Sequence, residues 1–238
     1  MIYVAGLGPG NPNLRAPQAT RAIGLSDVIV GYGAYVDLIR DEFPDKPTHE
    51  TGMRGEVARC AAALELSRGG KTVTVVCSGD AAVYGMASLI LELAGPEDEV
   101  EIIPGVTAAL AASAALGAPL AGDLAIVSLS DLLTPWQTIE KRLDAAALGD
   151  FAIAIYNPAS LKRADHLARA AEILLRRLPG ETPCGWVRNI AREGQTKKIT
   201  TLDRLARERV DMFTTVIVGN SATILKDGRL ITPRGYRT

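Results

Sequence analysis

The chain has 238 residues, of which 47% are hydrophobic and 22% charged, and its formal net charge is −1. This composition is typical of a globular protein with one large hydrophobic core or two smaller ones. A net charge this small gives the protein no overall positive potential that would attract nucleic acid or a membrane. The sequence has no run of eighteen apolar residues, enters a strand without a basic leader, and has three cysteines without a CxxC pair. We therefore expect a cytoplasmic protein with reduced thiols, no metal site, and neither membrane nor nucleic-acid partners.

The first predicted strand, residues 2–5, runs into a glycine-rich loop at 6–12 with the sequence GLGPGNP. A dinucleotide-binding loop needs the spacing G-x-G-x-x-G, and position 11 is Asn. Pro9 and Pro12 also remove two backbone N–H donors that a phosphate would need. The sequence therefore argues against a nicotinamide-dinucleotide site and predicts a tight turn at the mouth of a sheet.

The stretch at residues 72–86, TVTVVCSGDAAVYGM, begins with a β-branched run typical of a strand buried on both faces of a parallel sheet. Ligands of open α/β sheets bind beyond the carboxyl ends of the strands, where Gly79 permits close backbone approach and Asp80 supplies an acceptor. A second strand end of this kind is predicted at Pro104-Gly105. Thr107 follows it and is a candidate N-cap of the next helix. The other elements predicted in this half are helices at 16–25, 35–39, 56–68, 87–93 and 108–116, strands at 28–30 and 100–103, and a polar loop at 43–53.

A glycine- and alanine-rich segment at 117–122 is the candidate linker, so we expect α/β domains at 1–116 and 123–238. The alternation of strands and helices starts afresh after it, and Pro135 occupies the first position of a predicted helix. The predicted strands of this half are 124–129, 151–156, 184–188, 195–201, 214–218 and 230–233, and its helices are 135–148, 164–177 and 202–209.

Three motifs in this order, GLGPGN (6–11), SGDAAVYGM (78–86) and PGVTAA (104–109), resemble the tetrapyrrole methylases, which use S-adenosyl-L-methionine. The segments LSDLLTPW (129–136), YNP (156–158), TTVIVGNS (214–221) and TPRGY (232–236) are similar to the subfamily that methylates C-17 of precorrin-3B, or of cobalt-factor III, and contracts the ring in cobalamin biosynthesis. The chain departs from the pattern at Ala81, where the family usually has Pro. It departs again at 121–124, where AGDL replaces the usual Gly-His-Asp-Phe.

The resemblance implies two α/β domains with the active site in the cleft between them, a tetrapyrrole substrate, S-adenosyl-L-homocysteine as the spent cofactor, and a homodimer. By position, the cofactor should contact Leu7, Gly79, Asp80, Val83, Thr107, Ala108, Tyr156, Asn157, Val187, Arg188 and Gly219. The substrate carries many carboxylates, which arginine binds well, and it should contact Gly8, Pro9, Gly10, Arg15, Arg54, Ser130, Thr134 and Arg234, with Arg188 and Arg192 as further candidates. An acid would assist the contraction, and Asp123 is the first candidate for it.

Methyl transfer from a sulfonium requires the enzyme to align the methyl donor with the acceptor carbon and to exclude water, and it does not require a nucleophilic side chain of the enzyme. The sequence agrees with this requirement, because no Ser, Cys or Thr has a His at a spacing known from nucleophilic catalysis. Alternatives remain open for individual residues, since Val83 and Val187 could be core residues and Thr107 only a helix cap. Alternatives for the whole chain are a sibling methylase acting at another ring carbon, a methylase of RNA or protein, and a binding protein without activity. The sequence also leaves open whether the macrocycle carries cobalt.

Overall fold

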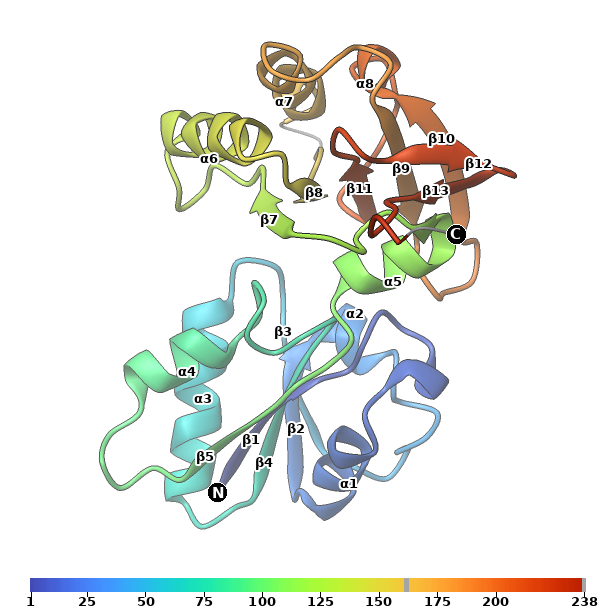
Figure 1. Cartoon of the computed structure of the whole chain (residues 1–238). Coiled ribbons are helices and arrows are strands. Elements are labelled where there is room, and N and C mark those ends of the chain that lie inside the picture. The colour runs from blue at the N-terminus through green and yellow to red at the C-terminus, as the bar shows by residue number, and fades with distance from the viewer. Residues whose placement is uncertain (161–162, 237–238) are drawn as a thin grey trace. The chain divides into compact units, whose positions relative to one another are not determined.

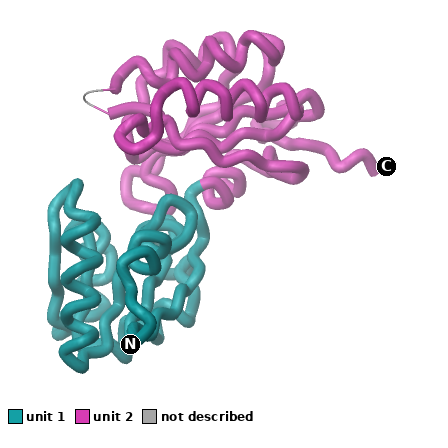
Figure 2. Tube along the Cα trace, turned by 90° about the vertical axis from the view of Figure 1, so that its left-hand side faces the viewer, with its two compact units in different colours: residues 1–108 teal, residues 109–238 magenta. Residues whose placement is uncertain are grey.

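The computed structural model describes residues 1–160 and 163–236. The chain divides into two compact units, Met1–Ala108 (unit 1) and Ala109–Thr238 (unit 2), drawn in two colours in Figure 2. The division lies before the predicted linker at 117–122, and the helix at 108–116 therefore belongs almost entirely to unit 2.

Two contacts explain why this helix belongs to unit 2. The backbone N–H of Ala109 donates a hydrogen bond of 2.6 Å to the hydroxyl of Tyr156. The side chain of Leu116 lies over Gly185, where a Cβ would come within 2.9 Å of a Leu116 methyl. Part of the predicted linker is also a short strand, Gly117–Ala118, that pairs inside unit 2.

Unit 1 has one five-stranded parallel sheet of order β3-β2-β4-β1-β5 (Figure 1). Its strands are β1 (Ile2–Gly6), β2 (Val28–Tyr32), β3 (Thr48–Thr51), β4 (Val73–Cys77) and β5 (Val100–Ile103). Every residue of β4 is buried, as its nearly continuous apolar sequence predicts. The edge strand β3 falls in the predicted polar loop, because its sequence THET is largely exposed and has no apolar alternation.

Helices cover both faces of this sheet. They are α1 (Pro17–Leu25), α2 (Gly33–Val36), α3 (Glu56–Arg68) and α4 (Ala87–Leu93), with a 3-10 turn at Pro12–Leu14. Val4 and Val75 pack with Leu64 of α3 on one face, whereas Ile29 packs with Ile23 of α1 on the other. The carboxyl edge of the sheet is thus left to loops, which is where this type of sheet binds ligands.

Unit 2 has a mixed five-stranded sheet of order β10-β9-β11-β8-β7 and a small sheet of order β12-β13-β6. Its strands are β6 (Gly117–Ala118), β7 (Leu124–Ser128), β8 (Ala152–Tyr156), β9 (Pro183–Arg188), β10 (Thr196–Thr201), β11 (Thr214–Val218), β12 (Ile224–Lys226) and β13 (Arg229–Ile231). In the larger sheet β7 and β8 run parallel, and the other pairs are antiparallel.

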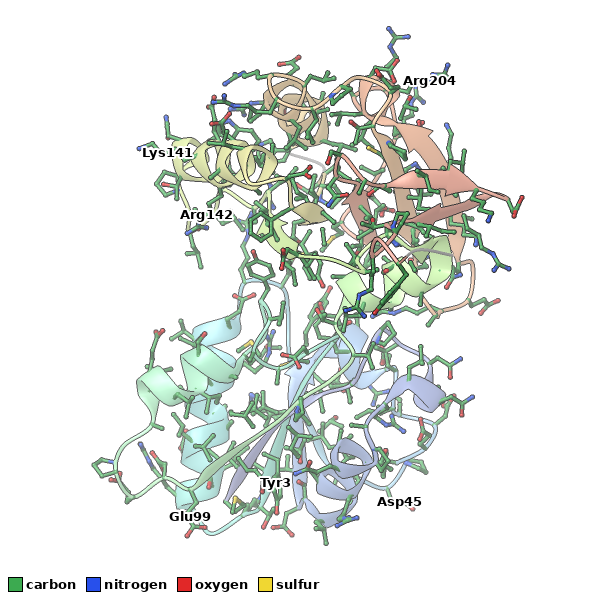
Figure 3. All side chains as sticks on the ribbon, viewed as in Figure 1. Tyr3, Asp45, Glu99, Lys141, Arg142 and Arg204 are labelled. Atoms are coloured by element: carbon green, nitrogen blue, oxygen red, sulfur yellow. The ribbon has the colours of Figure 1, made fainter. Side chains whose placement is uncertain are left out.

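The helices of unit 2 are α5 (Ala108–Leu116), α6 (Trp136–Leu148), α7 (His166–Leu174) and α8 (Leu202–Leu205). Leu143 of α6 and Leu167 of α7 pack with Ile155 of the sheet in one core. Lys141 and Arg142 are exposed and extend outward from α6 (Figure 3). Together the units confirm the predicted α/β class, and no helix of residues 1–160 and 163–236 is long and apolar enough to cross a membrane.

Candidate active site

The loops after β1 and β4 meet at the carboxyl edge of unit 1. The backbone N–H of Gly8 donates to the carbonyl of Gly79 at 3.0 Å, and the N–H of Gly79 donates back to the carbonyl of Gly8 at 2.7 Å. Both glycines have positive φ, 72° at Gly8 and 69° at Gly79, a backbone that L side chains rarely adopt. Two motifs that lie seventy residues apart are therefore joined backbone to backbone.

The loop after β5 packs equally closely. A Cβ on Gly105 would lie 2.2 Å from the carbonyl oxygen of Gly79, and a Cβ on Gly6 would lie 2.7 Å from the same oxygen. Three strand ends thus meet with glycine backbone at each contact. Such an edge has no side chain at these positions, so a ligand could approach its backbone closely.

The carboxylate of Asp80 organises the same edge. Its Oδ1 accepts hydrogen bonds from the N–H groups of Ala82 at 2.8 Å and Val83 at 3.0 Å, and its Oδ2 accepts one from Gly105 at 2.8 Å. Carboxylates bonded by several backbone N–H groups are held firmly in one orientation. Asp80 therefore shapes the loops of the predicted cofactor site.

In unit 2 the ends of the parallel strands β7 and β8 form a second polar edge. Ser128 lies opposite Tyr156 in the register, and the N–H of Leu129 donates to the Tyr156 carbonyl at 2.9 Å. Asn157 follows with a left-handed φ of 52°, and its amide Nδ2 donates to Ser128 Oγ at 2.9 Å. The YNP segment is therefore a structured turn at the end of a buried strand.

The loop after β7 carries a group of charged and aromatic side chains. Asp131 Oδ1 lies 3.6 Å from Arg163 Nη1, and Asp131 Oδ2 lies 3.7 Å from His166 Nε2. Arg163 Nη1 also donates to Ser130 Oγ at 2.8 Å, and the ring of Trp136 lies 4.7 Å from that of His166. Asp131 belongs to the LSDLLTPW segment, but no local pattern in the sequence points to its partners Arg163 and His166.

The three cysteines offer no reactive thiol. All are buried, and desolvation raises the pKa of Cys60 to about 11 and the pKa of both Cys77 and Cys184 to about 12. A thiolate nucleophile is therefore disfavoured at these positions. Among residues 1–160 and 163–236, no three side chains of His, Cys, Asp or Glu come together as a candidate metal site.

Comparison with known proteins assigns the family. Residues 1–206 match the family described as Tetrapyrrole (Corrin/Porphyrin) Methylases. The chain belongs to the tetrapyrrole methylase family. Membership makes it a methyltransferase, and the resemblance carried by its glycine motifs is confirmed.

Individual relatives show which members of the tetrapyrrole methylase family the chain resembles. The chain is 46% identical over 239 aligned residues to the probable cobalt-factor III C(17)-methyltransferase of Salmonella typhimurium, with 99% of both chains covered. It is 47% identical to the cobalamin biosynthesis protein CbiHC of Archaeoglobus fulgidus, but it spans only 52% of that protein. The crystal structure of the methyltransferase CobJ is 41% identical, with a TM-score of 0.92 over 98% of this chain and 99% of that one.

Unit 1 brings most of its predicted ligand contacts together. Gly8, Gly79 and Asp80 share the network described above, and the N–H of Leu7 donates to the Cys77 carbonyl at the end of β4 at 2.8 Å. Of the other positions that the methylase resemblance implies in unit 1, Thr107 is buried directly before α5, Val83 and Ala108 are partly buried, and Pro9 and Gly10 lie in the same loop as Gly8.

The two arginines predicted for the substrate in unit 1 differ in their surroundings. The Arg15 side chain is buried, forms an ion pair with Glu42, and donates from Nε to Thr20 Oγ1 at 3.0 Å. Arg54 is exposed in a turn with a φ of 66°. Arg15 is therefore neutralised inside its unit, whereas Arg54 is open to solvent.

The predicted residues of unit 2 fall at two ends of its sheet. Because β11 runs antiparallel to β8 and β9, Arg188 pairs with the start of β11 at Thr214, whereas Gly219 follows the end of β11. Asp123 precedes β7, so it lies on the Gly219 side, and the length of β7, roughly 16 Å, separates it from the loop that carries Ser130. One end thus gathers Ser130, Tyr156, Asn157 and Arg188, and the opposite end carries Asp123 and Gly219.

The remaining predicted positions of unit 2 are spread over three elements. Val187 is fully buried in β9, Arg188 pairs with Asp211 at 2.7 Å, and Thr134 is partly buried in the loop before α6. Arg234 is exposed, with its guanidinium carbon 5.7 Å from the ring centre of Tyr236.

Proposed function

We propose that this methylase transfers a methyl group to C-17 of a cobalt-bearing tetrapyrrole, cobalt-factor III, and that contraction of the macrocycle accompanies the transfer in cobalamin biosynthesis. The observation that carries the proposal is the full-length identity of 46% to a protein named for this reaction. The name of that relative favours the cobalt-bearing macrocycle over its metal-free counterpart.

We propose S-adenosyl-L-methionine as the methyl donor. The sulfonium supplies an activated methyl group and a good leaving group, so that the chain has to align donor and acceptor and exclude water. The edge formed by Gly8, Gly79 and Gly105 supports this proposal, because glycine at these positions leaves no side chain between the backbone and a bound cofactor. Asp80 holds this edge in shape through its three backbone hydrogen bonds.

The other predicted cofactor contacts remain part of the proposal. In unit 1 they are Leu7, Val83, Thr107 and Ala108, and in unit 2 they are Tyr156, Asn157, Val187, Arg188 and Gly219. For unit 2, the clustering of Tyr156, Asn157 and Arg188 at one end of the sheet supports these three more than it supports Gly219.

The resemblance to the methylases also leads us to propose a homodimer that acts in the cytoplasm. Light scattering during size-exclusion chromatography measures the assembly directly. A mass of twice the chain's 25.2 kDa supports the dimer, and a mass of one chain rejects it.

Turnover with defined macrocycles tests the function. The protein is incubated with S-adenosyl-L-methionine and, in separate reactions, with cobalt-factor III, metal-free precorrin-3B and a tetrapyrrole of an earlier methylation stage. We expect S-adenosyl-L-homocysteine to form in step with methylated macrocycle, and fastest from cobalt-factor III. Preference for the earlier tetrapyrrole would instead identify a sibling methylase, and no turnover of any macrocycle would reject the proposal.

A further inference from the structure

Asp131 and His166 form a paired side-chain site beside the strand ends of unit 2. Asp131 follows β7 by three residues, and His166 is the first residue of α7. The His166 side chain is only 5% exposed, whereas that of Asp131 is 37% exposed. Of the two, Asp131 is therefore the group that a substrate can reach.

The backbone fixes which nitrogen of His166 carries a proton. Nδ1 lies 2.8 Å from the carbonyl oxygen of Leu129, and a carbonyl can only accept a hydrogen bond. Nδ1 is therefore the donor, and Nε2 is the nitrogen that faces Asp131 Oδ2 at 3.7 Å. A bare Nε2 and a carboxylate oxygen are both acceptors, so a hydrogen bond between them would require one proton held by the pair.

The surroundings hold both side chains in place. The ring of His166 packs against Trp136 at 4.7 Å, and the guanidinium carbon of Arg169 lies 3.8 Å from the centre of the Trp136 ring, so that His166 is supported by aromatic packing. On the other side Arg163 is near Asp131 Oδ1 and bonds Ser130 Oγ. Among residues 1–160 and 163–236, Arg163 thus faces Asp131, and Arg169 lies behind Trp136.

The pair lies at the end of the sheet that carries the predicted ligand contacts. Ser130 precedes Asp131 directly, and Ser128 is bonded to the amide of Asn157. Asp123, the acid expected from the sequence, lies at the other end of β7. A proton carried by Asp131 would therefore be available near Ser130 and Asn157, where Asp123 is not.

We propose that Asp131 is the proton donor for ring contraction and that His166 positions it and holds its proton in reserve. The inference rests on the proposed function. The shared proton, where it rests on His166 Nε2, first moves to Asp131 Oδ2, and the Asp131 O–H bond then breaks as the proton passes to a macrocycle atom that gains negative charge. The pair then consists of a carboxylate and a neutral imidazole with its Nδ1 proton, and one proton from solvent restores it after turnover.

General acids of this kind accelerate reactions about 10²- to 10⁴-fold. We expect the separation of 3.7 Å to shorten to hydrogen-bond length in the substrate complex, as catalytic contacts commonly tighten there.

Two conservative variants test the roles separately. Asp131→Asn keeps the shape of the side chain and removes the acid. His166→Asn keeps an amide N–H near the position of Nδ1, where it can still bond the Leu129 carbonyl, and removes Nε2. Asp144→Asn is the matched control, because Asp144 pairs with Arg177 on the helical layer and touches none of these groups.

The first readout separates kcat from KM with cobalt-factor III. We expect Asp131→Asn to lower kcat for the contracted product by about 10² or more, with KM and S-adenosyl-L-homocysteine affinity changed less than about threefold, and methylated but uncontracted macrocycle to accumulate. His166→Asn should lower the same kcat by about tenfold, and Asp144→Asn should match the wild type. An unchanged kcat in Asp131→Asn, or a selective loss of contraction in Asp123→Asn instead, would overturn the proposal.

The second readout does not depend on turnover. The chain has only two histidines, so ¹⁵N-histidine labelling gives two imidazoles, and His49→Gln identifies the signals of His166. We expect Asp131→Asn to move the Nε2 resonance of His166 and to leave Nδ1, which is bonded to Leu129, nearly unchanged. An Nε2 resonance indifferent to this substitution rejects the shared proton. If the wild type converts no cobalt-factor III, the proposed function fails, and this measurement still decides whether the two residues share a proton.

Discussion

The carboxylate of Asp80 accepts a hydrogen bond of 2.8 Å from the backbone N–H of Gly105 and so ties the end of β4 to the end of β5. The other carboxylate oxygen bonds two N–H groups of its own loop, at Ala82 and Val83. The sequence predicts the Asp80 carboxylate as an acceptor beside a ligand, but in the structure its oxygens bind backbone N–H groups of the loops. Loss of this carboxylate should therefore disturb the backbone of the proposed cofactor site.

Replacing Asp80 should weaken both folding and cofactor binding. Asp80→Ala leaves three backbone N–H groups without their acceptor, which should lower the free energy of unfolding by about 1–3 kcal/mol. Asp80→Asn should lose less, because its carbonyl can still accept at Ala82 and Val83 while its NH₂ faces the Gly105 N–H. Urea unfolding measures stability, and calorimetry with S-adenosyl-L-homocysteine measures affinity. Equal affinity in wild type and both variants would show that this loop does not shape the cofactor site.

The close approach at Gly105 predicts a strong effect of a single methyl group. Because a Cβ would lie 2.2 Å from the Gly79 carbonyl, Gly105→Ala must push apart the loops after β4 and β5. We expect a loss of about 2 kcal/mol or more in unfolding free energy and weaker binding of S-adenosyl-L-homocysteine.

A second glycine provides the control for this change. Gly24 is exposed within α1, and a Cβ there meets no atom within 4 Å. Gly24→Ala should therefore stabilise the protein by about 0.5–1 kcal/mol and leave binding unchanged. Equal stability of the two alanine variants would contradict the backbone packing described here.

The hydroxyl of Tyr156 should stabilise the start of α5. It accepts a hydrogen bond of 2.6 Å from Ala109, whose N–H lies in the first turn and has no partner within the helix. Tyr156→Phe should lower the unfolding free energy by about 1 kcal/mol. Tyr3→Phe is the comparison, because the partly buried Tyr3 of β1 (Figure 3) makes no side-chain hydrogen bond within the described residues. If both substitutions had the same effect, the capping role of Tyr156 would be wrong.

The buried thiols predict a loss of stability at alkaline pH. The pKa of Cys77 and of Cys184 rises to about 12 in the folded chain, from a usual value of 9.0. Between these values the unfolded chain releases the thiol protons and the folded chain retains them, so the stability present below pH 9.0 is lost as pH rises toward 12.

Urea unfolding at about pH 8 and about pH 10.5 measures this effect. We expect each thiol to account for roughly 1–2 kcal/mol of the difference between the two conditions. The variant with both Cys77→Ala and Cys184→Ala should show a correspondingly smaller pH dependence. The same pH dependence in variant and wild type would mean that these thiols ionise as easily when folded.

Much of unit 1 could be predicted because its signals are local. The β-branched run before Ser78 predicts a buried strand, and β4 lies there with a one-residue shift, at Val73–Cys77. Close backbone approach was predicted at Gly79, and in the structure the backbones of Gly6 and Gly105 lie against its carbonyl oxygen. The edge strand β3 was missed, because four exposed polar residues form a strand only through pairing with β2.

The arrangement of unit 2 could not be predicted in the same way, because a strand's sequence does not reveal its direction. The strand at 214–218 was expected at the right place, but only the antiparallel register shows that Gly219 and Arg188 lie at opposite ends. The contact of Asp131 with His166 joins residues 35 positions apart and depends on how the first residue of α7 meets the loop after β7, where His166 also bonds the Leu129 carbonyl. No periodicity or motif encodes such a contact.

The position of the transferred methyl group tests the central claim most directly. The protein is supplied with S-adenosyl-L-methionine labelled with ¹³C in the methyl group and with cobalt-factor III, and the isolated product is examined by ¹³C correlation spectroscopy. The proposed function predicts one labelled methyl group, bonded to C-17 of a contracted macrocycle. Label on another ring carbon, or on a macrocycle that has not contracted when wild-type protein is used, would contradict it.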